Sequence, residues 1–328
     1  MITQLGLKGF KSFVNECVSI KPLTVLTGLN SSGKSSIIQG VRMFDALYKG
    51  KSALLEGHGS LQEMKSRLTS SMLLTMNLAD GNTMTFDGIT FSSERRVDFP
   101  HITYIGANRV GASQTIPVLN ESYEIGEKGE NVLNCLNHYE DQTLDERLKP
   151  KEGEGLTLDF MVKGWLKYIS PGVKFDYQIE PKADVSFGTY NGNRAANVGF
   201  GLSYTLPIIV ALLTSTIIPN SVVLIENPEA HLHPKGQTEM GRLIGLCVEC
   251  GSQVIVETHS DHLFDGIRIF TKRTRDFSDK MVAYWVEQHY DKGSSVLPIY
   301  IDNNGRYTED CPRGFFDQFE NNANELLF

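Results

Sequence analysis

Short apolar runs alternate with helix-like segments through the second half of the chain. The runs at residues 222–225, 254–256 and 281–286 are continuously apolar, and helix-like segments at about 203–218 and 235–250 precede the first two. A strand that is buried on both faces carries such a continuous run, and strands that alternate with helices are typical of parallel sheets. We therefore predict an α/β fold with a mainly parallel sheet.

The first half of the chain has a different pattern. A compact strand at residues 24–27 leads into a glycine-bounded loop and a helix-like segment at about 34–48. Residues 71–105 alternate apolar and polar positions, and turn signals at 80–82 and 87–88 interrupt them. Alternation with such turns predicts an antiparallel β subdomain.

Residues 120–195 carry the weakest pattern. A charged segment at 131–149 and a second segment at about 158–169 predict helices, and no heptad pattern runs long enough for a coiled-coil arm. We predict one domain in three parts: an N-lobe at 1–119, an inserted helical lobe at 120–195 and a C-lobe at 196–328. A turn signal at 303–305 predicts a final hairpin at 296–307.

Composition narrows the class of protein. The 328 residues are 41% hydrophobic and 21% charged, which is enough apolar sequence for a buried core. The net charge of -8 argues against general nucleic-acid binding and leaves room for a local basic patch. Five scattered cysteines favour a reducing, cytoplasmic location. The most apolar stretch, residues 204–218, is shorter than the roughly 20 residues that a membrane span needs, so we expect no membrane contact.

Residues 28–35 fit the pattern G-x-x-x-x-G-K-[ST], between the first predicted strand and helix. Gly28 and Gly33 permit backbone conformations that turn successive N–H groups towards phosphate oxygens at the helix N-terminus. Lys34 would reach the β- and γ-phosphates, and the Ser35 hydroxyl would ligate Mg²⁺. The other loop residues expected to contact the nucleotide are Asn30, Ser31, Ser32 and Ser36. The pattern therefore predicts an ATP and Mg²⁺ site.

Polar residues end two of the predicted parallel strands. Glu226 follows the run at 222–225, Glu229 comes three residues later, and His259 follows the run at 254–256. Carboxylates at this edge of a sheet suit Mg²⁺ ligation by Glu226 and activation of a water by Glu229. His259 would sense the γ-phosphate. Which carboxylate has which role remains open, and a solvated strand end is the alternative for each alone.

Taken together, these motifs resemble the ABC-type ATPase heads of the SMC and OLD families, among the AAA-named ABC-like ATPases of bacteria. Residues 197–204 are similar to the signature segment of that family. The resemblance implies that Gly201 and Ser203 contact the γ-phosphate of ATP held by the other subunit. It therefore implies a homodimer that encloses ATP between two heads.

Two features depart from the family pattern. Glu226 stands where most ABC ATPases carry Asp, and Tyr204 follows the signature serine where Gln is commoner. The Q-loop has no clear counterpart, and Gln114 and Arg109 are its candidates. No coiled coil is evident, and the sequence after His259 is too short for a TOPRIM nuclease.

The leading hypothesis is a Mg²⁺-dependent ATPase that gates a separate effector protein, a nuclease or toxin, in bacterial anti-phage defence. Contact with DNA would then be indirect or weak. The alternative is an SMC-like DNA repair or recombination ATPase that acts on DNA directly. A transporter ATPase is disfavoured because the signature is not LSGGQ.

Overall fold

The computed structural model describes residues 1–328 with the exception of 58, 94–97, 112–114, 119–121, 199 and 328. The chain divides into two compact units. Unit 1 joins both ends of the chain, Met1–Ile102 and Arg275–Phe328, and unit 2 is the continuous segment Thr103–Thr274. The predicted lobe boundaries stay a prediction.

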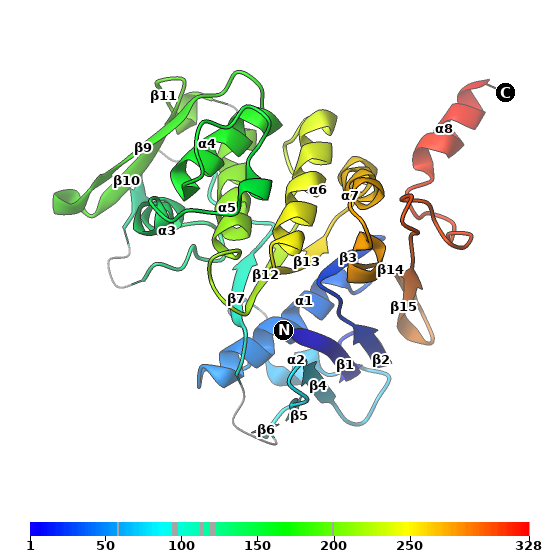
Figure 1. The fold of residues 1–328 in the computed structure, drawn as a ribbon. Coiled ribbons are helices and arrows are strands. Elements are labelled where there is room, and N and C mark those ends of the chain that lie inside the picture. The colour runs from blue at the N-terminus through cyan, green and yellow to red at the C-terminus, as the bar shows by residue number, and fades with distance from the viewer. Residues whose placement is uncertain (58, 94–97, 112–114, 119–121, 199, 328) are drawn as a thin grey trace. The chain divides into compact units, whose positions relative to one another are not determined.

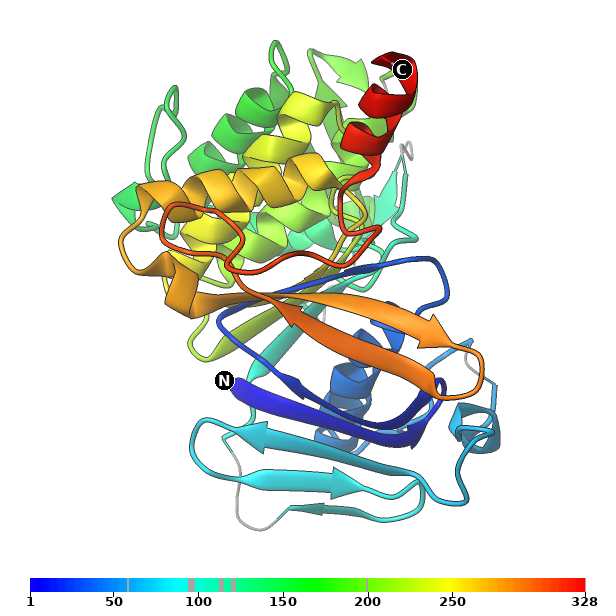
Figure 2. The ribbon, with the colours of Figure 1, turned by 90° about the vertical axis from the view of Figure 1, so that its right-hand side faces the viewer.

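An antiparallel sheet in the order β2-β1-β4-β5-β6 forms one part of unit 1 (Figure 2). The antiparallel pairing of β4 with β5 and of β5 with β6 confirms the predicted β subdomain. The side chains of Leu5 and Leu7 on β1 are buried beside Gly40 of α1, the predicted helix. The elements of this part of unit 1 are β1 (Ile2–Phe10), β2 (Phe13–Ser19), α1 (Lys34–Tyr48), α2 (Leu61–Met64), β4 (Leu73–Leu78), β5 (Thr83–Phe86) and β6 (Phe91–Ser93).

The strand before the phosphate loop, β3 (Leu23–Gly28), is buried along its whole length. It pairs in parallel with β14 (Met281–His289), with Leu23 opposite Met281 and Gly28 opposite Val286. On its other side β14 pairs in antiparallel with β15 (Gly293–Ile299). Strands that are far apart in the sequence therefore pair with each other in unit 1.

The C-terminal segment differs in part from the predicted hairpin. The expected turn forms, closed by a single bridge between Ile301 and Tyr307, but the long hairpin is β14–β15. Beyond it the Phe315 ring packs against Trp285 of β14. The helix α8 (Gln318–Leu327) follows, and none of its described side chains is buried. The short 3-10 helix η4 (Phe277–Lys280) precedes β14.

Unit 2 combines parallel strands with a cluster of helices (Figure 1). Strand β12 (Ser221–Glu226) pairs in parallel with β13 (Gln253–Glu257). Continuous burial of both strands confirms what their apolar runs predict. The long helices are α4 (Leu158–Ile169), α5 (Phe200–Thr214), α6 (Pro234–Glu249) and α7 (Asp261–Arg273), and β7 (His101–Ile105) crosses the boundary between the units.

The segment 120–195 is less helical than its sequence predicts. The helix α3 (Val132–Tyr139) ends early because the backbone of residues 142–144 bonds to Leu156 and Leu158 instead of continuing the helix. A β-hairpin of β9 (Phe175–Glu180) and β10 (Val185–Tyr190) also forms there. The remaining elements are β8 (Ile116–Pro117), β11 (Asn193–Arg194) and the 3-10 helices Glu146–Leu148, Pro181–Ala183 and Ala195–Asn197.

Among the described residues, no helix combines the length and the apolar character that crossing a bilayer requires.

Candidate functional site

The phosphate loop of unit 1 has the backbone that its glycines predict. Gly28 (φ 148°), Ser31 (φ 63°) and Gly33 (φ 116°) all have positive φ. A Cβ atom on Gly28 would lie 2.2 Å from the carbonyl oxygen of Val286, so a side chain there has no room. The loop then enters α1 at Lys34, where the first N–H groups of a helix lack intrahelical partners and attract anions.

The side chains of the loop divide into buried and exposed sets. Lys34 is only 3% exposed, and its Nζ donates to the carbonyl oxygens of Gly28 (3.0 Å) and Leu29 (2.8 Å). The Ser32 hydroxyl is buried without a hydrogen-bond partner among the described residues. Asn30, Ser31 and Ser35 are exposed, whereas Ser36 is buried. The buried Lys34 ammonium suits a phosphate group. The polar residues around it suit a metal ion bound to that phosphate.

In unit 2 a tight turn follows β12 and carries both candidate carboxylates. Glu226 ends the strand, and Asn227 takes a left-handed conformation (φ 47°). The Asn227 N–H donates to the carbonyl of Glu257, at the end of β13, over 2.9 Å. The turn thus aims Glu229 back towards the end of β13.

The Glu229 carboxylate is bound by the segment that follows β13. Its Oε1 accepts the backbone N–H of His259 over 2.8 Å. Its Oε2 is buried and has no hydrogen-bond partner among the described residues. Burial raises the pKa of Glu229, and the His259 N–H, the Thr258 side chain and the positive charge of Arg109 oppose that rise. A carboxylate with one oxygen fixed and the other without a hydrogen-bond partner among the described residues suits a base that takes a proton from water.

Arg109 stabilises this turn through hydrogen bonds to its backbone. Its guanidinium is buried and donates to the backbone carbonyls of Glu226 and Asn227. The sequence offered Arg109 as a Q-loop candidate, and the structure gives it a structural contact with the carboxylate turn. Gln114, the other candidate, lies outside the described residues.

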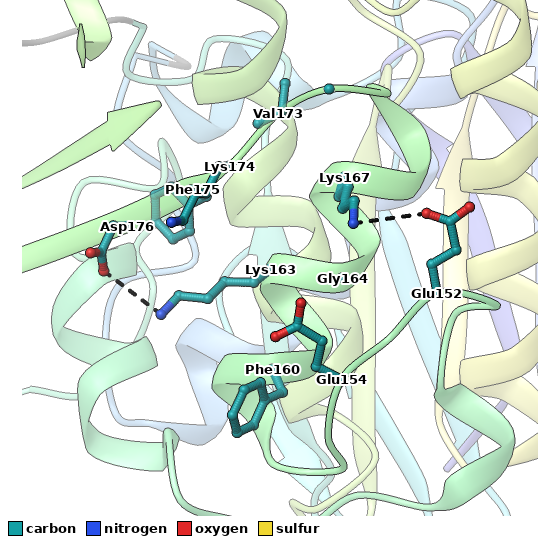
Figure 3. A pocket seen from close by; sticks show the side chains of 11 residues that line it. Glu152, Glu154, Phe160, Lys163, Gly164, Lys167, Val173, Lys174, Phe175 and Asp176 are labelled. Atoms are coloured by element: carbon teal, nitrogen blue, oxygen red, sulfur yellow. Dashed lines mark ion pairs between the residues drawn. The ribbon is translucent and has the colours of Figure 1, made fainter. Parts of the chain in front are cut away.

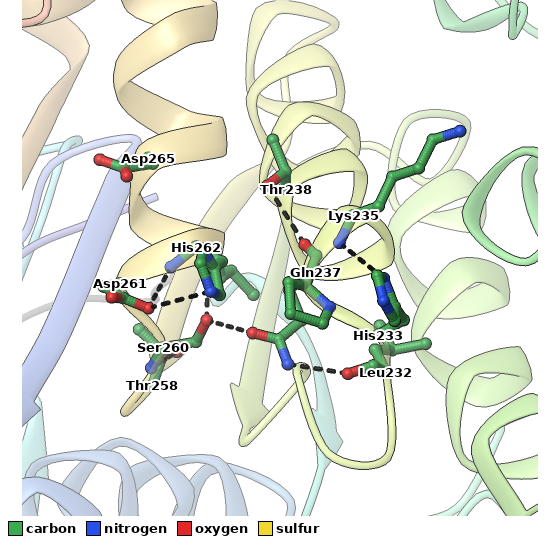
Figure 4. A network of polar contacts seen from close by, with 12 residues as sticks. Leu232, His233, Lys235, Gln237, Thr238, Thr258, Ser260, Asp261, His262 and Asp265 are labelled. Atoms are coloured by element: carbon green, nitrogen blue, oxygen red, sulfur yellow. Dashed lines mark hydrogen bonds and ion pairs between the residues drawn. The ribbon is translucent and has the colours of Figure 1, made fainter. Parts of the chain in front are cut away.

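A polar network joins the loop after Glu229 to the His259 segment (Figure 4). Gln237 of α6 donates to the carbonyl of Leu232 over 2.8 Å, and its Oε1 accepts the Ser260 hydroxyl over 2.5 Å. Ser260 also caps α7 by accepting the N–H of Leu263. Gln237 therefore fixes the position of the backbone beside His259, whose side chain is exposed.

The signature segment begins α5 in the same unit. A Cβ atom on Gly201 would lie 2.7 Å from the His231 carbonyl oxygen, so this position requires glycine. The Ser203 hydroxyl bonds to the phenol of Tyr190, whose pKa burial raises to about 12. Gly199 lies outside the described residues.

The structure brings Glu229 and His259 together, places Gly201 against the loop that follows Glu229, and leaves the phosphate loop in the other unit. Sequence reasoning missed the contacts of Arg109 and Gln237, and the buried Glu257 that pairs in register with Glu226. The only signal for Glu257 is its place at the end of an apolar run. Arg109 and Gln237 act through backbone carbonyls far away in sequence, which no local pattern reports.

A separate cavity of about 540 Å³ lies in unit 2 beside α4 (Figure 3). Lys163 and Lys167 point into it, and they pair with Asp176 (3.7 Å) and Glu152 (3.8 Å). Three lysines and three carboxylates line it, so it has no net charge that would select a ligand.

Residues 108–264 match the family model described as "AAA ATPase domain". The matched residues all lie in unit 2, so this segment is similar to AAA ATPase domains. The match spans Arg109, the signature segment, both carboxylates and His259, and it confirms the predicted ATPase. No curated protein matches the chain at a significant level.

Solved structures confirm the fold of this ATPase. It is similar to an SMC head domain from Thermotoga maritima, with 15% identity, a TM-score of 0.50, and coverage of 92% of this chain and 99% of that one. It is also similar to an SMC head from Pyrococcus furiosus with an extended coiled coil, bound to the C-terminal domain of ScpA. That match has 14% identity and a TM-score of 0.52, and covers 100% and 99% of the two chains. At these identities the likeness shows the SMC head fold.

Proposed function

We propose that the protein is a Mg²⁺-dependent ATPase that dimerises head to head around ATP and gates a separate effector. The observation that carries the catalytic part is Glu229: one oxygen accepts the His259 N–H, and the other is buried without a hydrogen-bond partner among the described residues. Glu229 takes the proton of the attacking water in this proposal. Because its carboxylate is already oriented, little reorganisation precedes the reaction.

The other residues bind and sense the nucleotide. Lys34 and the amides that begin α1 bind phosphate oxygens, with Asn30, Ser31, Ser32 and Ser36 around them. Ser35 and Glu226 supply oxygen ligands, which Mg²⁺ prefers. Ser35 and Glu226 would hold this ion, which would neutralise phosphate charge. His259 contacts the γ-phosphate, and its backbone bond to Glu229 links that contact to the general base.

Gly201 and Ser203 complete the site of the partner subunit in this proposal. The close approach of Gly201 to the His231 carbonyl supports it, because this contact fixes the start of α5 against the loop that follows the base. ATP that contacts both subunits binds the closed dimer preferentially, so hydrolysis would open it. An effector that recognises one of the two states would be gated by ATP.

For the biological role we propose anti-phage defence in the cytoplasm, with a nuclease or toxin as the effector. Direct action on DNA, as in repair or recombination, is the second candidate, since the fold is that of an SMC head. Lys272 and Arg273 at the end of α7 are the residues to test. Binding to duplex DNA that falls steeply with salt, and that K272E/R273E weakens, would favour direct action.

The decisive variant for the catalytic proposal is Glu229→Gln, which keeps the shape of the side chain and removes the base. We expect turnover to fall by at least about 100-fold while ATP affinity stays within about 2-fold of wild type. An ATP-dependent dimer should accumulate in size-exclusion chromatography. Glu239→Gln on α6, a carboxylate paired with Arg242, is the matched control and should leave turnover unchanged. Wild-type turnover of Glu229→Gln would refute the assignment of the base.

A further inference from the structure

Arg109 binds three backbone carbonyl groups at once. Its Nη1 donates to the carbonyl oxygens of Gly106 (2.9 Å) and Glu226 (2.8 Å), and its Nη2 donates to that of Asn227 (2.7 Å). The side chain is 3% exposed, so water does not compete for these bonds. The rigid, planar fork of a guanidinium suits this arrangement, whereas a lysine ammonium offers only a point charge.

The face of the same guanidinium is covered by an aromatic ring. The Arg109 guanidinium carbon lies 5.4 Å from the centre of the Tyr204 ring, within the range of a cation–π interaction. Tyr204 in turn meets the His231 ring edge to face, with 4.8 Å between the ring centres and 72° between the planes. Tyr204 belongs to α5 and His231 to the loop after Glu229. Arg109, Tyr204 and His231 are therefore in contact one after the other, and they connect three separate segments of unit 2.

The charge of Arg109 and the charge of Glu229 stabilise each other. Burial lowers the pKa of Arg109. Four nearby groups oppose that decrease: the carboxylates of Glu229 and Glu226 and the phenols of Tyr204 and Tyr104. Glu229 receives the N–H of His259 on its other side. The buried cation thus compensates part of the cost of keeping a carboxylate charged in this turn.

We infer that Arg109 and Tyr204 are positioning residues for Glu229: Arg109 fixes the turn that carries the base, and Tyr204 holds Arg109 and ties the signature helix to that turn. This inference rests on the proposed role of Glu229. It also gives a physical reason for a tyrosine after Ser203, because a glutamine at this position offers no aromatic face to the guanidinium.

The test measures kcat and KM for ATP in the full chain with Mg²⁺, beside thermal unfolding. Tyr204→Phe keeps the ring and should stay within about 2-fold of wild type, whereas Tyr204→Leu should lower kcat by about 10-fold with KM little changed. Arg109→Lys keeps the charge and loses the fork, so we expect kcat to fall by about 10- to 100-fold. In the double variant R109K/Y204L, kcat should be no lower than in R109K alone, because both residues act through one contact.

Four results would overturn the inference. Tyr204→Leu with wild-type kcat would show that the ring is dispensable, and equal losses in Tyr204→Phe and Tyr204→Leu would assign the effect to the hydroxyl. Losses that multiply in the double variant would show that Tyr204 acts separately, for example on the nucleotide of the partner subunit. Glu229→Gln in the same assay distinguishes failure of the proposed general base from failure of the positioning role. Wild-type turnover of that variant refutes the base itself, whereas an inactive E229Q beside an unaffected R109K refutes only the positioning role.

Discussion

The phosphate loop and the carboxylate turn reach their shapes by opposite means. The loop is specified largely by its own residues: its glycines take the positive φ angles, and Lys34 bonds back to the carbonyls of Gly28 and Leu29. The turn after β12 is held from outside, by Arg109 from 117 positions earlier and by the backbone of residues 257–259. A local motif is therefore visible in sequence, whereas a turn held by distant residues is not.

The largest effect should come from Gly28→Ala. The added Cβ would lie 2.2 Å from the Val286 carbonyl oxygen, and φ of 148° strains any side chain, so we expect a loss of about 3 kcal/mol in the free energy of unfolding and loss of ATP binding. Chemical denaturation and nucleotide titration measure the two. Gly50→Ala is the control, with φ of 70° and open space, and should cost about 1 kcal/mol without affecting ATP. If both variants lost the same stability and bound ATP equally well, the close approach of Val286 in β14 to Gly28 would be contradicted.

A smaller effect is expected at Asn227, which tests the externally held turn. Its side-chain Oδ1 is buried without a partner among the described residues, so the residue serves chiefly to permit the left-handed backbone. Asn227→Val should cost about 2 kcal/mol of stability and lower kcat, while Asn227→Gly should keep both. Denaturation and steady-state kinetics provide the measurements. If Asn227→Gly is as inactive as Asn227→Val, the side chain matters and not the backbone conformation.

The smallest effect should follow Ser260→Ala. This change removes the cap of α7 and the bond to Gln237, at about 1 kcal/mol in the free energy of unfolding. Turnover should fall only a few-fold, since the His259 N–H to Glu229 bond remains. Ser278→Ala, at an exposed hydroxyl in unit 1, is the control. An unchanged unfolding curve for Ser260→Ala would show that the network does not stabilise unit 2.

Elements whose pattern is local were predicted well from the sequence. The strand, loop and helix around Lys34 and the runs that become β12 and β13 follow from composition and spacing alone. The β9–β10 hairpin was not predicted, because residues 181–184 lack an Asn-Gly or Asp-Gly turn signal and Asp184 itself takes the left-handed conformation (φ 50°). The predicted helix to residue 149 failed because pairing of the backbone around Thr143 with Thr157 replaced helical bonds.

The candidate site shows the same division. The pattern named Glu229 and His259, and the structure joins them by a hydrogen bond. The contact between Arg109 and the turn, and the one between Gln237 and Ser260, depend on tertiary packing between segments far apart in the chain. Their roles in turnover are still predictions that the variants above address.

The parallel pairing of β3 with β14 has a consequence for biosynthesis. The strand that leads into the phosphate loop ends at Gly28, yet its partner β14 begins only at Met281. Domains that are continuous in the chain can fold as they leave the ribosome. Unit 2 is continuous and unit 1 is not, so during translation the strand before the phosphate loop must wait, with one edge uncovered, until the residues between Gly28 and Met281 have been synthesised.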